Sequence, residues 1–262
     1  MKKITLTLIA FATIFSSCTK IIDVELEDAN KRTTIDAIIK NGLDNVTTRI
    51  TKSGNFFGST SNPAISDATV VLNDGTTDYP LSNLGNGNYE LTGFTANTNK
   101  SYSMKVTQGG EIYEATTFMP TIVRIDTVNA VYQPASTFNE EGYVLSIVFQ
   151  DSPSVENYYR IELDIAGERY GAIDDLILLD DGLLDGNLVE FPMFGADVAQ
   201  LGDTVIMYLN SIDKQAFDYY NAIDNILYGN AEAPANPKSN FDNNALGNFS
   251  AFTTDTLVIV VQ

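Results

Sequence analysis

Hydrophobic and polar residues alternate in short runs over residues 34–119, and glycine, asparagine, aspartate and proline separate these runs. A period of two places successive side chains on opposite faces of a strand, so each run predicts a half-buried β-strand. Several short strands in close succession are typical of a β-sandwich. The predicted strands cover residues 34–40, 46–51, 69–73, 76–79, 88–91, 102–107 and 111–117.

Turn residues indicate where these strands are joined. Asp74-Gly75 and Gly109-Gly110 each separate two predicted strands. Both dipeptides suit a type I′ hairpin, in which both central residues have positive φ. Pro120 is predicted to end this first module, because proline has no backbone N–H for a strand ladder.

The second half of the chain shows similar strands and one helix. Asp213 is a suitable N-cap for a helix over residues 213–228, and Gly229 is a suitable stop. The apolar face of this helix consists of Phe217, Tyr220, Ile223 and Leu227. Such a stripe favours packing on a sheet. The predicted strands cover residues 122–131, 143–150, 158–165, 204–209, 248–252 and 257–261.

These patterns predict a mainly β protein with two domains. We expect a β-sandwich at residues 33–120 and a second antiparallel β domain at residues 121–262, covered by the single packed helix. We find no repeat of fixed period, which argues against solenoids and propellers.

The N-terminus has the parts of an export signal. Two lysines precede an apolar run over residues 4–15, which is too short to span a membrane as a helix. Small residues then precede Cys18, the only cysteine of the chain. This arrangement is typical of a lipoprotein signal, and an ordinary signal peptide is the alternative. We expect residues 1–17 to be removed and residues 18–32 to form an acylated N-terminus and a polar tether.

Composition excludes several classes of function. The 262 residues include 15 Lys and Arg against 34 Asp and Glu, and the formal net charge is -19. An acidic chain is poorly suited to nucleic acid, whose recognition requires a basic face. The chain contains no histidine, which excludes Ser/His/Asp and Cys/His catalysis and histidine-ligated metals. The sequence therefore indicates the location and architecture of the protein more directly than its activity.

Several segments resemble a known family. They are the region around Cys18, the strings DATVVLNDG, GNGNYEL, SYSMKV and GEIYEATTFMP in the first half, and VENYYRIEL, GDTVIMYLNSIDKQAFDYY and NPKSNFDNNALGNFSAF in the second. The chain is identified as a member of the Bacteroidota lipoprotein family labelled domain of unknown function (DUF) 4249. The first half also resembles immunoglobulin-like and carboxypeptidase-regulatory-like modules. The resemblance implies an outer-membrane, cell-surface lipoprotein that is associated with TonB-dependent transporters and is not an enzyme.

Aspartates gather between residues 174 and 185. Ca²⁺ takes about six to eight oxygen ligands, so Asp180, Asp181 and Asp185 are candidate ligands of a structural calcium ion. The alternating D-x-D-x-D-G spacing of a calcium loop is absent, and a solvated acidic loop is the alternative. A glycosidase also requires a carboxylate pair, which is a third interpretation of these residues. Apart from this candidate Ca²⁺, we predict no cofactor.

The tail over residues 236–250 carries the strongest family pattern and contains few strand signals. Its polar residues Asn236, Lys238 and Asn240 are candidate contacts with a protein partner. In the alternative interpretation the tail is a loop that seals the core, with Leu246 and Phe249 plugging the second sheet.

Three functional hypotheses follow. The first is a non-catalytic, lipid-anchored binding or accessory module that serves an outer-membrane β-barrel, such as a TonB-dependent transporter in nutrient uptake. The second is a structural subunit of an outer-membrane complex or an adhesion module. The third is an enzyme acting on glycans or peptides. A search for co-purifying partners distinguishes the first two from the third.

Overall fold

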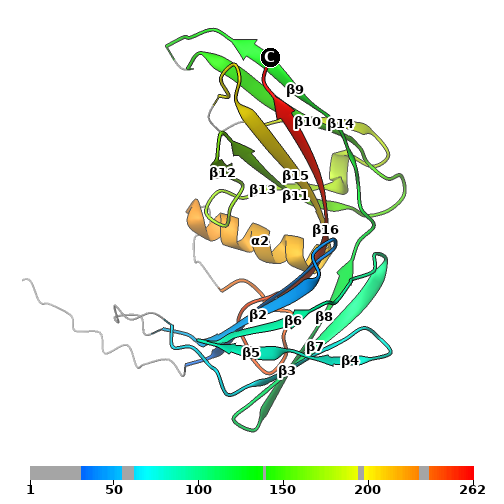
Figure 1. The fold of residues 1–262 in the computed structure, drawn as a ribbon, viewed down its shortest axis with the longest axis vertical. Helices are drawn as coiled ribbons and strands as arrows, with labels where there is room; N and C mark the ends of the chain where they lie inside the picture. The colour runs from blue at the N-terminus through cyan, green and yellow to red at the C-terminus, as the bar shows by residue number, and fades with distance from the viewer. Residues whose placement is uncertain (1–30, 55–61, 138–139, 194–197, 230–235) are drawn as a thin grey trace, which may run out of the picture.

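The computed structural model describes residues 31–54, 62–137, 140–193, 198–229 and 236–262. Within these residues the chain is mainly β, as predicted, with three sheets and one α-helix. Figure 1 shows the strands of the first half below helix α2 and those of the second half above it. Strand β16 runs from one half into the other.

The largest sheet contains strands from both halves. Along its path the order is β12 (Glu168–Tyr170), β11 (Tyr158–Ile165), β15 (Thr204–Ile212), β16 (Phe249–Val260), β1 (Thr33–Lys40), β2 (Asn45–Lys52), β6 (Asn88–Thr92) and β5 (Ser82–Gly85). Strand β13 (Ile177–Asp180) also pairs with β11.

The halves are joined by strands from opposite ends of the chain. β1 pairs with β16 in parallel, with Ala37 opposite Phe249, whereas the other pairs of named strands in the described residues are antiparallel. The sequence analysis did not predict this pairing. It makes the first and last strands of the described chain neighbours in one sheet.

Two smaller sheets pack against the large one. The first has the order β4 (Asp78–Pro80), β3 (Thr69–Asn73), β7 (Lys100–Gln108) and β8 (Glu111–Met119), and the second has the order β14 (Leu188–Pro192), β10 (Gly142–Gln150) and β9 (Ile125–Gln133). Each encloses a hydrophobic core against the large sheet, as in a β-sandwich. The first core contains Phe241 and Phe249 from the tail. The proposed division at residue 120 stays a prediction.

The two predicted hairpins differ in their turns. Gly109 and Gly110 both have positive φ and join β7 to β8, which confirms the two-residue turn. Asp74 does not have positive φ, so the predicted type I′ turn is wrong there. β3 and β4 still form a hairpin, because the Asp74 carboxylate accepts the N–H groups of Thr76 and Thr77 at 2.9 Å and closes a longer loop.

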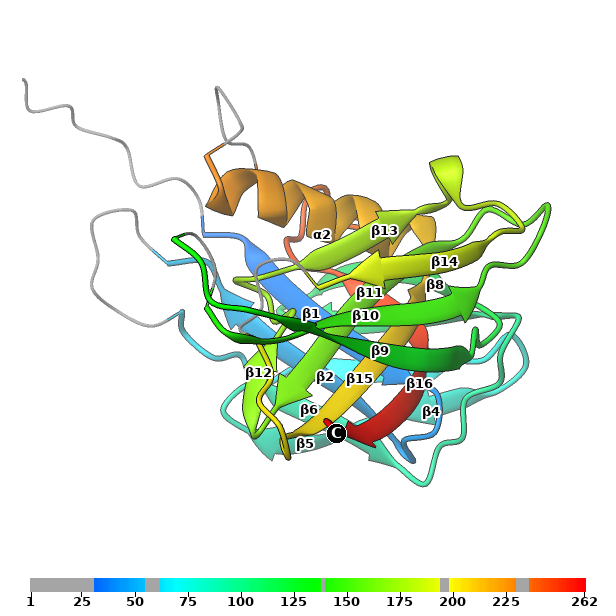
Figure 2. The same cartoon turned by 90° about the horizontal axis from the view of Figure 1, so that it is seen from above.

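Helix α2 (Lys214–Leu227) begins and ends where predicted. The Asp213 carboxylate accepts the N–H of Ala216 at 2.8 Å, and Gly229 follows the helix with positive φ. Tyr220 is buried, whereas Leu227 in the last turn is 53% exposed and does not join the packed face as predicted. Seen from above, α2 lies along one flank of the strands (Figure 2).

Other strands depart from the predictions in length and number. Predicted strands 248–252 and 257–261 form the single strand β16, and β5, β12, β13 and β14 were not predicted. The segment in which aspartates gather, residues 174–185, is called the acidic stretch. It contains β13 and the short 3₁₀ helix η1 (Asp181–Leu183). In the described residues, no helix is long and apolar enough to cross a membrane. The predicted signal, Cys18 and most of the tether lie outside the described residues.

Candidate functional site

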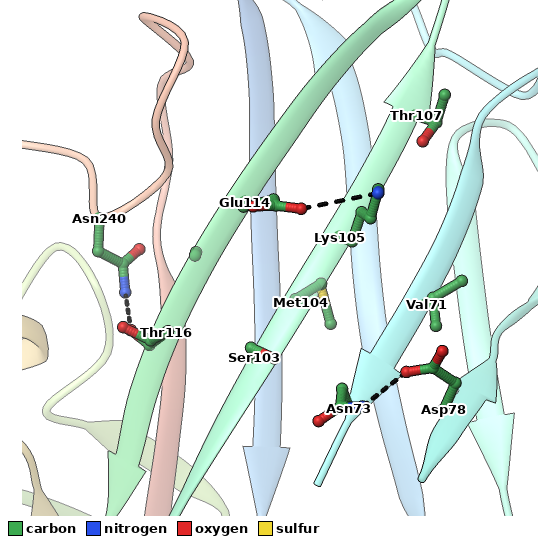
Figure 3. Close-up of a pocket in the computed structure, with 11 residues that line it drawn as sticks. Val71, Asn73, Asp78, Ser103, Met104, Lys105, Thr107, Glu114, Thr116 and Asn240 are labelled. Atoms are coloured by element: carbon green, nitrogen blue, oxygen red, sulfur yellow. Dashed lines mark hydrogen bonds and ion pairs between the residues drawn. The ribbon is translucent and has the colours of Figure 1, made fainter. Parts of the chain in front are cut away.

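A hollow of about 620 Å³ lies over the outer face of the four-stranded sheet (Figure 3). Polar side chains cross this face in a row, because the strand register places neighbours opposite one another. The row consists of Asp78 on β4, Asn73 on β3, Ser103 on β7 and Thr116 on β8. Their amide, hydroxyl and carboxylate groups offer both donors and acceptors to a ligand.

Contacts within the hollow hold several side chains in place. The Asn73 amide donates to the Asp78 carboxylate at 2.6 Å, and Lys105 pairs with Glu114 across β7 and β8 at 3.7 Å. The residues that line this hollow include no aromatic side chain. The surface is therefore suited to hydrogen bonding rather than to stacking.

The tail forms one wall of the hollow. Asp242 pairs with the edge of β8, where its N–H donates to the Glu114 carbonyl at 3.0 Å and its carboxylate accepts the Glu114 N–H at 2.7 Å. The Asn240 amide donates to the carbonyls of Thr116 and Phe249, and its oxygen accepts the Phe249 N–H at 2.9 Å. The tail thus covers the edge of β8 and satisfies its backbone groups.

The three predicted contact residues of the tail have different environments. Asn236 and Lys238 are exposed, as a partner contact requires. Asn240 is half-buried and its side chain is engaged with the backbone, so it shapes the wall. Phe249 is fully buried in the first core, not in the second as the alternative interpretation assumed.

A second hollow adjoins the first, and a third adjoins the second. One of about 330 Å³ shares Thr116 and Asn240 with the first hollow and extends to Asp218 on helix α2. Another of about 510 Å³ shares Asp218 and extends to Asp181. We call these three adjoining hollows the groove. It runs from the four-stranded sheet past the start of α2 to the acidic stretch.

The far end of the groove is strongly acidic. Its charged lining residues are Glu156, Asp180, Asp181, Asp218 and Lys214. Lys214 pairs with Asp218 at 2.9 Å, which raises the pKa of Lys214. Burial raises the pKa of the Tyr158 hydroxyl, and its hydrogen bond to Glu156 adds to that effect. This end of the groove favours a positively charged group.

Three aspartates meet beside this end. One carboxylate oxygen from each of Asp151, Asp181 and Asp185 lies within 4.8 Å of the others. Asp151 is fully buried and accepts hydrogen bonds from the Tyr159 hydroxyl and from the Gly186 N–H. We call these three residues the acidic cluster.

Asp181 lacks a full set of partners in this cluster. Its Oδ1 atom is buried and accepts no hydrogen bond from the part of the chain that the structure describes. Burial raises the pKa of Asp181, and the charges of Asp151 and Asp185 add to that effect. A cation bound between the carboxylates would provide the partner that this oxygen lacks and would offset the repulsion among the three charges.

The structure brings together two of the three predicted calcium ligands. Asp181 and Asp185 belong to the acidic cluster, whereas Asp180 is not a member and caps η1 by accepting the Gly182 N–H at 3.0 Å. Sequence reasoning missed Asp151, which follows β10 and lies far from the acidic stretch along the chain. No ligand spacing connects it to Asp181.

Comparison with known proteins gives a family and no activity. A family model described as "Domain of unknown function (DUF4249)" matches residues 19–257. No curated protein matches the chain.

Proposed function

Because the chain belongs to the DUF4249 family, whose description assigns no activity, we propose a function from its groove and its sequence. The protein is a non-catalytic binding module that is anchored to the outer membrane by lipid at Cys18. Its partner is an outer-membrane β-barrel, in particular a TonB-dependent transporter in nutrient uptake.

The observation that carries this proposal is that the three hollows follow one another, each sharing at least one lining residue with the next. Three adjoining hollows suit an extended ligand better than a compact one. The row of hydroxyl and amide groups suits the polar backbone of a peptide, and the acidic end suits a lysine or arginine. We therefore propose that the groove holds an extended, basic segment of the partner, such as a barrel loop.

The tail contributes to the same contact. Lys238 lines the middle of the groove, and Asn236 is exposed in the same segment. We propose that these two side chains touch the partner and that Asn240 fixes the wall beneath it. The structural-subunit hypothesis shares this barrel contact and differs only in having no segment bound in the groove.

The groove is tested by blocking its centre. Thr116→Arg places a large cation over the hydrogen-bonding row at an exposed strand position. We expect recovery of the barrel partner in a gentle-detergent pull-down to fall by about tenfold or more, because the ligand segment is displaced.

Thr47→Arg is the matched control, since Thr47 is also an exposed strand threonine but does not line the groove. Its recovery is expected to equal that of the wild type. Equal recovery with both variants would show that the partner does not use the groove and would favour the structural-subunit hypothesis.

The anchor is tested separately. Cys18→Ser removes the only thiol that can carry acyl chains. We expect the variant to leave the membrane fraction and to lose labelling by palmitate analogues, because multiple acyl chains make a stable anchor. Membrane fractionation with continued labelling would refute the lipoprotein proposal.

A structural Ca²⁺ in the acidic cluster is a second proposal. The unpartnered Oδ1 of Asp181 favours it, because a buried carboxylate oxygen without a donor is costly unless a cation is bound. Asp151, Asp181 and Asp185 would be ligands, and Ca²⁺ would supply the positive charge that this cluster lacks.

A further inference from the structure

A cluster of positive side chains lies on the face of the large sheet that carries helix α2. It consists of Lys40 on β1, Arg160 on β11 and Arg169 on β12. Strand register places Lys40 beside Phe252, which packs against the helix, and Arg169 opposite Asp164. None of the three lines the groove. The cluster is thus a feature separate from the proposed partner site.

Aromatic rings connect these cations. The Arg169 guanidinium lies 4.2 Å from the centre of the Tyr208 ring, and Lys40 Nζ lies 5.9 Å from the same centre. Lys40 Nζ also lies 5.7 Å from the Phe252 ring. Tyr208 therefore has a cation from β12 and another from β1 against one ring.

The positive charges are only partly compensated. Glu162 pairs with both Arg160 and Arg169. Lys40 forms no ion pair and no hydrogen bond with any residue that the structure describes. Asp164 lies opposite Arg169, but its carboxylate accepts the Gly167 N–H at 2.8 Å and forms no ion pair within the described chain. Among the described acidic residues, Glu162 is thus the only one that forms ion pairs with this cluster of three cations.

The environment of Lys40 penalises its charge. Burial lowers the pKa of Lys40, and although Glu162 opposes this effect, Arg169 and Arg160 add to it. Acidic side chains are abundant in a chain of net charge -19, yet none of those described pairs with this ammonium. An anion from outside would supply the missing countercharge.

We propose that Lys40, Arg169 and Tyr208 form a binding site for a phosphate group. The ammonium offers three N–H donors, and the Arg169 side chain is 40% exposed. A phosphate monoester carries a charge of about −1.5 to −2 at neutral pH, which matches the two positive charges that Glu162 leaves over. A carboxylate would supply one negative charge and leave the other cation unmatched.

Calorimetric titration with inorganic phosphate at low ionic strength tests the site. We expect saturable binding to the wild type, and Lys40→Gln to weaken it by about tenfold or more, since a charge-assisted hydrogen bond is lost. Arg169→Gln is expected to weaken it as well. Thermal melts of both variants establish that they are folded.

Lys52→Gln is the matched control, because Lys52 is a half-buried strand lysine like Lys40, makes the same change of charge, and lies outside both the cluster and the groove. It should bind phosphate as the wild type does. Absence of saturable phosphate binding to the wild type, together with absence of Lys40-dependent vesicle binding, would overturn the proposal. Equal weakening by Lys52→Gln would also overturn it, because only the net charge would then matter.

Vesicles distinguish a soluble phosphate from a lipid headgroup. Flotation is measured with phosphatidic acid vesicles, whose headgroup is a phosphate monoester, and with phosphatidylcholine vesicles, using protein without its acyl anchor. Binding of phosphatidic acid that depends on Lys40 identifies a headgroup, whereas Lys40-dependent binding of free phosphate alone identifies a soluble ligand. Both outcomes support the site. If Lys40→Gln binds free phosphate and vesicles as the wild type does, the proposal is refuted.

Discussion

At the scale of single residues, the carboxylate of Asp181 combines two unfavourable circumstances. Its Oδ1 atom is buried without a donor among the described residues, and the charges of Asp151 and Asp185 lie nearby. Because its folded-state pKa is raised, the ionised carboxylate destabilises the fold at neutral pH in the absence of a cation. This cost disappears as the pH falls below the ordinary aspartate value of 3.8, where folded and unfolded chains are both protonated.

Asp181→Asn tests both the cost and the proposed calcium ion. In EDTA at neutral pH, we expect the variant to melt at a higher temperature than the wild type, and the difference to shrink as the pH is lowered towards 3.8. With Ca²⁺ at about 100 times its dissociation constant, the wild type should gain about 2.7 kcal/mol and the variant much less. An unchanged melting temperature of the wild type on Ca²⁺ addition would contradict the calcium proposal.

At the scale of elements, the parallel pair β1/β16 depends on one close backbone approach. The Ile35 and Ala37 N–H groups donate to the carbonyls of Leu246 and Asn248 at 2.9 Å, on either side of Gly247. Gly247 has φ of +92°, and a Cβ at this position would overlap the Ile35 carbonyl. Only glycine meets both requirements here.

Gly247→Ala should therefore separate β1 from the tail. We expect it to lower the free energy of unfolding by more than ~2 kcal/mol in urea denaturation, because a backbone atom must move to admit the methyl group. Gly202→Ala is the control, since Gly202 has φ of +93° but no neighbour within 4 Å of an added Cβ. It carries only the backbone strain, about 1 kcal/mol. Equal losses in both variants would show that the close approach has no separate cost.

At the scale of the whole molecule, the two halves share more than a linker. The large sheet runs through both, and the first core includes Phe241, Ala245, Phe249 and Ala251 from the end of the chain. A fragment that ends near residue 120 would lack these side chains and β16, one of the two strands that pair with β1. Because of this arrangement, we do not expect either half to fold alone, as the sequence-based prediction of two independent domains would require.

Limited proteolysis decides between these descriptions. Residues 134–141 connect β9 to β10, and those described are exposed, so we expect cleavage there. The two fragments should elute together in native size-exclusion chromatography and separate only in denaturant, because β1 and β16 remain paired. Two folded fragments that elute separately would instead support independent domains.

The sequence by itself determined the features that depend on neighbouring residues. Asp213 and Gly229 marked the ends of the helix, and Gly109-Gly110 marked a hairpin, because caps and tight turns are set by local backbone geometry. Alternation likewise identified most strands, since it reports which side chains face a core. The same local evidence pointed to Asp181 and Asp185 of the acidic cluster, although Asp180 from the same stretch is not a member.

Only the tertiary structure decided which distant residues meet. A period of two gives the face of a strand but not its neighbour, so the pairing of β1 with β16 was not predictable. The same reason explains why Asp151 was missed beside Asp181, and why the Lys40 cluster around Tyr208 was not seen. These side chains come from segments far apart in the chain, and only the folded arrangement of the sheets and their connections brings them together.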